Sequence, residues 1–129
     1  MASWPNLEAV AVAHLRTVTG YRTSTRIPSD LAGTVPLIRV MRGPGSDDRI
    51  TDSALLDVES FTARDGSAVD MWDLAEAVRE AMHDLTGNAV NGALIDRVTT
   101  ATGPTFLDYG NPAVDRVVAS YRFEARKQF

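Results

Sequence analysis

The chain contains no cysteine, and this absence removes several kinds of chemistry at once. It excludes disulfide bonds, a thiolate nucleophile and thiolate metal ligands, so the fold has to be held together by packing alone. Long apolar runs are missing as well, since no stretch comes near the roughly 20 residues that span a bilayer. The first residues also lack the basic and apolar blocks of a signal peptide. We therefore expect a soluble, unprocessed protein without a membrane partner.

The chain also has fewer basic residues than acidic ones. The chain has 17 Asp and Glu residues against 13 Lys and Arg residues, which leaves a net charge of −4. This balance argues against the broad basic surface that a protein needs to bind duplex DNA without reading its sequence. The two histidines are His14 and His83, and neither has a histidine or carboxylate three or four residues further along, as a helical metal pair requires.

Catalytic signatures are absent from the sequence too. No nucleophile elbow or other triad pattern accompanies the Ser, Thr and Asp residues. Asp57 and Glu59 lie two residues apart on a predicted strand and would form a carboxylate pair on one face, but a solvated or subunit-facing sheet surface explains them better. We therefore predict no catalytic residues, no bound cofactor and no metal ion.

What the sequence does contain is the pattern of one α+β domain over residues 1–129, with 44% hydrophobic and 23% charged residues. Apolar residues recur at helical spacing from Leu7 to Val18 and from Met71 to Leu85. Strands are predicted for residues 35–42, 51–63, 93–101 and 116–126. The order helix, strand, strand, helix, strand, strand predicts a mainly antiparallel four-stranded sheet with two helices packed on one face.

Turn and capping residues predict several boundaries. Pro5 suits the first turn of the first helix, and Ser67 with Asp70 forms a variant of a capping box before the second. Residues 21–34 are polar and too irregular for a strand, so we expect an ordered excursion or a flap. Residues 102–112 carry the glycines and prolines of a turn.

The second and last predicted strands each have two different faces. Ala54, Leu56 and Val58 should point into the core, because side chains alternate along a strand. The opposite side, called the outer face below, carries charge of both signs and some apolar surface, and its charges can pair between subunits or within one sheet. The outer-face residues that we expect to meet other subunits are Leu55, Asp57, Glu59, Phe61, Arg116, Arg122 and Arg126.

The stretch RGPGSDDRITD, residues 42–52, has three interpretations. A phosphate-binding loop leads into a helix and usually carries Lys, whereas this one joins two strands and has none. The carboxylates of Asp47, Asp48 and Asp52 lack the spacing of a calcium loop. The third interpretation is a long hairpin loop in which the glycines have positive φ and the aspartates bond to turn amides. Its length suggests contact with a partner, through Gly43, Gly45, Asp47, Asp48 and Arg49.

Taken in order, these segments resemble the tail terminator proteins of long-tailed phages, of the type found in phages of actinobacteria. The resemblance rests on the stretches RIPSDL, VPLIRVMR, the G-x-G loop with SDDRITD, LLDVESFTA, DMWDLAEAVREAMHDL and RVVASYRFEARK. It extends from Leu7 to Arg126 and is most specific from Gly43 to Ala63 and in the helix that follows.

The resemblance implies a structural protein of siphovirus virions that has no catalytic residues. Proteins of this kind form a ring, typically of six subunits, that sits on the last ring of the tail tube and stops tube growth. The other side of the ring is offered to the head completion proteins. DNA would pass through the lumen without being read, and the protein would act at the head–tail junction after assembly in the host cytoplasm.

Three other functions stay open from the sequence. A head completion or head–tail joining protein would share the size and the acidity of this chain. An enzyme, a small metal-dependent hydrolase, would use Asp47, Asp48 and Asp52. A nucleic-acid-binding module would show a steep dependence of affinity on salt.

Overall fold

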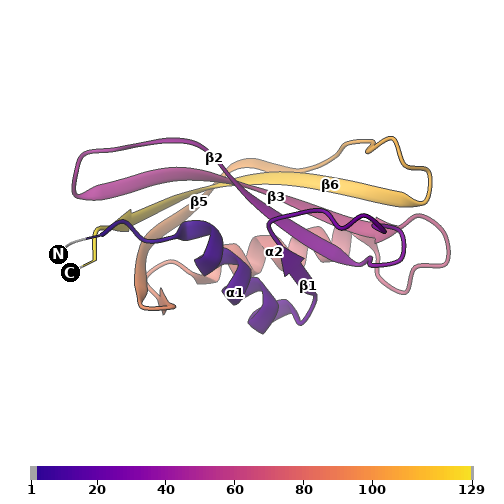
Figure 1. Ribbon diagram of the computed structural model, residues 1–129, viewed down its shortest axis with the longest axis horizontal. Helices are drawn as coiled ribbons and strands as arrows, with labels where there is room; N and C mark the ends of the chain where they lie inside the picture. Colours follow the sequence, from indigo (N-terminus) through magenta and orange to yellow (C-terminus); the bar gives the residue numbers. More distant parts are fainter. Residues whose placement is uncertain (1–2, 129) are drawn as a thin grey trace.

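A computed structural model describes residues 3–128 and has one twisted sheet with two helices lying against the same side of it (Figure 1). The elements in chain order are α1 (Leu7–Thr19), β1 (Arg22–Ser24), β2 (Leu37–Asp47), β3 (Thr51–Ala63), α2 (Met71–Asp84), β4 (Ala89–Val90), β5 (Ala93–Phe106) and β6 (Val114–Arg126). Within the described residues, neither helix combines the length and apolar character that a membrane crossing requires.

The sheet confirms the predicted α+β class and corrects the predicted strand count. Its spatial order is β1-β2-β3-β6-β5-β4, so it has six strands where four were expected. The four long strands pair antiparallel, but β1 lies parallel to β2, which makes the sheet mixed. The two additional strands are short and lie at the edges, and strands of two or three residues are too short to show a period of two.

The centre of the sheet is the pairing of β3 with β6. This antiparallel ladder runs from Thr51 opposite Arg126 to Ala63 opposite Val114 without a register shift. By contrast, β2 shifts register between Arg42 and Gly45, and β5 shifts at several points. The residues 102–106 therefore continue β5 through these irregularities, where the sequence predicted a turn.

The main core lies between the sheet and the two helices. As predicted, Ala54, Leu56 and Val58 of β3 are buried on the helix side, opposite the outer face. The predicted apolar stripe of α2 is also buried, apart from the half-buried Met71. The largest members of this core are Leu7, Leu15, Ile38, Leu56, Leu74, Met82, Leu85, Ile95, Tyr121 and Phe123.

Capping residues fix where the helices begin and end. Asn6 caps α1 by accepting a hydrogen bond from the Ala9 amide at 3.1 Å, so Pro5 lies before the helix and not in its first turn. Gly20 ends α1 at a φ of 74°, a conformation that favours glycine. Asp70 caps α2 by itself, because the Ser67 hydroxyl bonds within the preceding turn and does not complete the predicted capping box.

The segment between β1 and β2 covers one end of the outer face. Leu31 packs there with Leu37, Phe61 and Val114 in a second buried cluster, and Ile27, Val35 and Tyr109 lie against it. The predicted excursion at residues 21–34 is therefore ordered, and its first part is strand β1.

The sheet edge formed by β1 is partly closed by a side chain. The Arg16 Nε donates a hydrogen bond to the Thr23 carbonyl oxygen at 2.9 Å, and Thr23 itself is buried. This bond occupies a backbone acceptor that an edge strand would otherwise offer to another chain.

Tyr121 provides a test of the core. Its hydroxyl is buried and has no hydrogen-bond partner among residues 3–128. Replacing Tyr121 with Phe should therefore leave the free energy of unfolding at pH 7 unchanged or raise it by up to ~1 kcal/mol, as measured by urea denaturation. A Tyr21→Phe variant, altered at a half-buried tyrosine next to the same core, is the control.

The same tyrosine should give the protein an alkaline pH dependence. Burial raises the pKa of Tyr121 to about 12, and the nearby Arg79 guanidinium offsets part of that rise. Because an unfolded tyrosine ionises near pH 10, the unfolded state loses this proton first, and stability falls as the pH rises from 10 towards 12. The Tyr121→Phe variant should lose less stability over this range, and an equal loss in both proteins would contradict the assignment.

Candidate interaction site

The register of β3 and β6 brings the predicted outer-face residues onto one side of the sheet. Leu55 lies opposite Arg122, Phe61 lies opposite Arg116, and Arg126 ends the same row opposite Thr51. Asp57 and Glu59 occupy the positions between them. All seven predicted residues therefore share a face, although they are not equally open.

Glu59 is the most enclosed charge on this face. Its carboxylate accepts hydrogen bonds from Arg39 Nε at 2.5 Å and from Arg116 Nη1 at 3.0 Å, and only 3% of the residue is exposed. Arg116 also lies over the Tyr109 ring and donates to the carbonyl oxygens of Leu107 and Asp108. Opposite charges thus pair within one sheet here, which was one of the two arrangements left open by the sequence.

Other parts of the same chain cover a portion of the outer face, so the expectation that the whole face is available to neighbouring subunits was too broad. Phe61 is fully buried, with the Tyr109 ring edge-on at a centroid distance of 5.1 Å. With Glu59 also enclosed, a partner would meet the other half of the face, towards the hairpin, where Leu55, Asp57 and Arg122 are half-buried. The sequence could not show this, because the covering segment carries no periodic pattern that places it over the sheet.

The β2–β3 hairpin extends past the helices at the end of the molecule where both termini lie (Figure 1). Strand β2 continues through Gly43 and Gly45 as far as Asp47, so the loop is shorter than predicted. Neither glycine has positive φ, and Arg49 at the tip does, with a φ of 73°. Gly45 is required for another reason, since a Cβ there would lie 2.3 Å from the Ser53 carbonyl oxygen.

The hairpin is tied to the first helix at its bulge. The Glu8 carboxylate accepts a hydrogen bond from the Arg42 amide at 2.8 Å, at the point where the β2–β3 register shifts. The Arg42 side chain turns to the buried Asp52, with Nη2 at 2.8 and 2.7 Å from its two carboxylate oxygens. These contacts hold the base of the hairpin against the body of the protein.

The three aspartates of the hairpin have separate partners. Asp48 Oδ1 accepts from the amides of Ile50 and Thr51 at 2.9 and 2.6 Å, and Asp47 Oδ1 accepts from the Arg49 amide at 2.9 Å. The predicted bonding to turn amides is thus confirmed for Asp47 and Asp48. Within residues 3–128, no group of three or more His, Asp or Glu side chains is arranged as a metal site.

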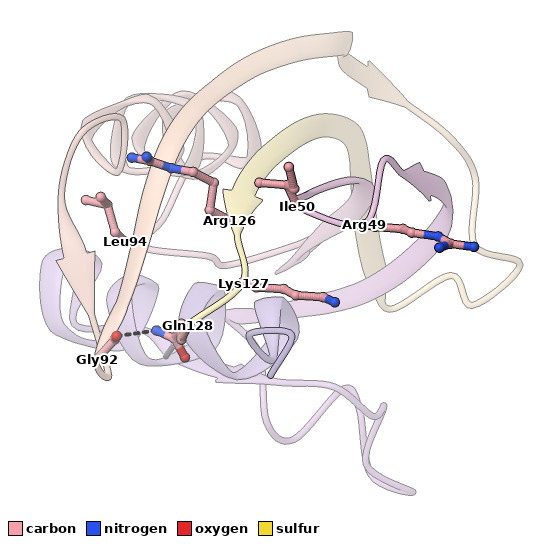
Figure 2. Close-up of a pocket in the computed structure, with 7 residues that line it drawn as sticks. All are labelled: Arg49, Ile50, Gly92, Leu94, Arg126, Lys127 and Gln128. Atoms are coloured by element: carbon pink, nitrogen blue, oxygen red, sulfur yellow. Dashed lines mark hydrogen bonds between the residues drawn. The ribbon is translucent and has the colours of Figure 1, made fainter. Parts of the chain in front are cut away.

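An open hollow of about 560 Å³ lies beside the hairpin tip (Figure 2). Figure 2 shows Ile50 entering from the hairpin, Leu94 from the start of β5, and the end of the chain passing between these segments. The Lys127 amide donates to the Ile50 carbonyl oxygen at 2.9 Å, and the Gln128 side chain donates to the Gly92 carbonyl oxygen. Its lining residues are Arg49, Ile50, Gly92, Leu94, Arg126, Lys127 and Gln128.

Most of this hollow was missed by sequence reasoning, which selected Arg49 and Arg126 but not Ile50, Leu94 or Lys127. Ile50 and Leu94 are exposed apolar side chains, and a single apolar residue in a turn gives no periodic signal. Two of the cationic residues that line the hollow already have partners. Arg126 forms an ion pair with Asp96 at 2.9 Å, and Lys127 Nζ lies 4.7 Å from the centre of the Trp4 ring. The ion pair with Asp96 raises the pKa of Arg126.

Glu59 should be the most sensitive charge on the outer face. A Glu59→Ala substitution leaves two largely buried guanidinium groups without their carboxylate, so it should lower the free energy of unfolding by about 3 kcal/mol in urea titrations. The matched control is Asp57→Ala, which removes a neighbouring carboxylate that accepts one hydrogen bond from Ser120 at 2.6 Å. The control should cost about 1 kcal/mol, and equal losses in the two variants would refute the network.

Asp48 should make the hairpin tip sensitive to acid. Its amide bonds lower the pKa of Asp48 below 3.8, so the stabilised turn is present above that pH and is lost as the pH falls through the lower folded value. In wild type, the amide proton shifts of Ile50 and Thr51 should follow this titration by NMR. Asp48→Ala should abolish the titration at both amides. Asp47→Ala should perturb the Arg49 amide and leave the titration at the Ile50 and Thr51 amides unchanged.

Comparison with known proteins assigns the chain to a family. A sequence profile of the phage tail termination protein family matches residues 3–129. A solved structure described as "Virion of native gene transfer agent (GTA) particle" contains a chain of similar fold, with a TM-score of 0.64 and 14% sequence identity over 93% of this chain and 94% of that chain. At this identity the likeness establishes the fold alone, and no curated protein matches.

The family profile covers both halves of the sheet, the hairpin and the two helices, so it spans all the surfaces described above. No comparison bears on the actinobacterial type, which stays a prediction. The resemblance seen in the sequence is confirmed at the level of the family: this chain belongs to the phage tail termination proteins, which are structural phage proteins.

Proposed function

We propose that the protein forms a ring, of six subunits, that caps the phage tail tube, stops its polymerisation and offers a surface for head attachment. The observation that carries this proposal is the family match along residues 3–129. Its partners would be further copies of itself, the tail tube protein and the head completion proteins. It would act at the head–tail junction of a siphovirus virion, after assembly in the host cytoplasm.

The geometry favours contact through protruding or open surfaces over a chemical role. The hairpin with Gly43, Gly45, Asp47, Asp48 and Arg49 stands out from the body, and protruding segments on a rigid scaffold commonly carry binding. Leu55, Asp57 and Arg122 are half-buried on the part of the outer face that the chain leaves open, and they are proposed as a further contact. Glu59, Phe61 and Arg116 would support this surface from inside the same chain.

The charge of the chain suits a ring around DNA that is conducted and not read. A net charge of −4 provides no general attraction for phosphate, and strong phosphate binding would hinder passage of the genome. Sequence-independent DNA binding by the isolated protein is therefore not part of the proposed function.

Tail length tests the function directly. Phage made without this protein should contain tail tubes longer than the wild-type length when examined by electron microscopy, because nothing ends the addition of tube subunits. Supplying the wild-type chain from a plasmid should restore a single length. A plasmid carrying the same gene with an early stop codon is the control.

The alternative role in head completion predicts another phenotype. Tubes of normal length that lack heads would reject the terminator function and favour a joining protein. Normal, headed particles would reject both roles.

A further inference from the structure

Large exposed apolar side chains of this protein gather at two opposite ends of the sheet. Within residues 3–128 there are seven of them, and six belong to the two ends. Ile50 lies at the hairpin tip, Leu94 near the start of β5 and Trp4 just before α1, on the side of the termini, whereas Phe106 is the last residue of β5, Leu107 follows it and Trp72 is in the first turn of α2. Figure 1 shows that these two sets of segments belong to opposite ends of the sheet. Isolated exposed apolar residues are ordinary, but grouped ones mark contact surfaces.

The first end is hollow and basic. Ile50, 64% exposed, and Leu94, 44% exposed, stand on opposite sides of the hollow described above. Three cations line it, and among residues 3–128 the Arg49 side chain has no ion-pair partner. A volume of about 560 Å³ lies within the range of about 300–1,000 Å³ that holds small ligands, which is enough for a segment of two or three residues.

At the opposite end, two exposed apolar residues are followed by an acidic residue. Phe106 and Leu107 are exposed and are followed directly by Asp108. The Asp108 side chain is 72% exposed, and its nearest cation is Arg64 at 3.8 Å. Arg64 is already bonded to Asp115 at 2.9 Å, and Asp108 Oδ1 accepts a hydrogen bond from the Gly110 amide at 3.1 Å, so the exposed carboxylate is held in place without a close cation of its own.

The two ends cannot meet in one molecule. Leu94 and Phe106 lie near opposite ends of β5, a strand of 14 residues that spans about 40 Å. A contact between them must therefore join two copies. Because the two surfaces differ, each copy would use both, and a repeated contact of this kind generates a ring when the rotation closes.

We propose that the hollow beside the hairpin tip receives residues 106–108 of the next copy. Phe106 and Leu107 pack against Ile50 and Leu94, and the Asp108 carboxylate meets Arg49. The match combines apolar surface on both sides with one cation that has no ion-pair partner among residues 3–128 and one exposed carboxylate that has no close cation. This inference rests on the proposed ring and names the surfaces that join its subunits.

The cysteine-free chain allows a direct test by cross-linking. Phage lacking the protein would be complemented with the Ile50→Cys/Leu107→Cys variant, and purified particles would be treated with a mild oxidant. Because each copy then carries one thiol at each end of the contact, non-reducing gels should show a ladder of covalent multimers that ends at the number of subunits in the ring. Each single-cysteine variant should remain monomeric.

The matched control moves one thiol to an exposed site away from both ends. Val18 on α1 is 52% exposed and belongs to neither group, so the Ile50→Cys/Val18→Cys variant should give no ladder. A cross-link from Cys at position 50 to a protein of different mass would overturn the proposal, because it would show that the tube or a head protein occupies the hollow.

Charge reversal supplies a second readout. Arg49→Glu and Asp108→Arg, introduced singly into the double-cysteine chain, should each reduce the cross-linked product at least tenfold, and the two together should restore it. Unchanged melting temperatures of the purified variants would exclude misfolding as the cause. If neither reversal changed the amount of cross-linked product, the proposed ion pair between Arg49 and Asp108 would be rejected.

The outcomes separate the contact from the function. Normal tail length without a ladder would reject this contact and leave the terminator role intact. Overlong tubes in phage lacking the protein, together with a ladder from the complemented particles, support both.

Discussion

The unbroken antiparallel ladder between β3 and β6 is the constraint on which the rest of the structure depends. Thirteen residues of β3 pair in one register, so their side chains point alternately towards the helices and towards the outer face. A slip of one residue would place Asp57 and Glu59 in the core and Leu56 and Val58 outside. The same ladder holds the two ends of the molecule at a fixed separation, which a subunit of a regular assembly requires.

The outer face shows how one sheet surface is divided between folding and contact. At one end, residues 25–36 and Tyr109 cover Phe61, and Glu59 is neutralised by two arginines of its own chain. Towards the hairpin, Leu55 and Arg122 stay half-open. The enclosed half contributes stability, and the contacts proposed for the ring fall at the hairpin, on the half-open part of the outer face and at the two ends of the sheet.

The sequence predicted the parts of the fold that have a strong period. Both helices, β3 and the two-faced character of β6 follow from spacing alone, and Asp48 was correctly expected to bond turn amides. The glycines and prolines of residues 43–45 and 103–104 suggested turns, but irregular pairing carries β2 and β5 through both. Strand pairing thus continues past glycines and prolines that usually end a strand. Tertiary contacts also bury Glu59 and Phe61, and no local sequence pattern predicts that burial. The hollow at the hairpin tip escaped prediction because its walls come from three distant segments.

The bond from Arg16 to the carbonyl of Thr23 limits how the β1 edge can pair with another chain. β1 and β4 are short and pair only with Leu37–Arg39 of β2 and with Ala93 and Leu94 of β5, and one backbone acceptor of β1 is already occupied by Arg16, so at these places few free backbone groups remain to pair with another strand. At these stretches, open-ended stacking of copies through backbone bonds is disfavoured, and association there is left to side-chain surfaces.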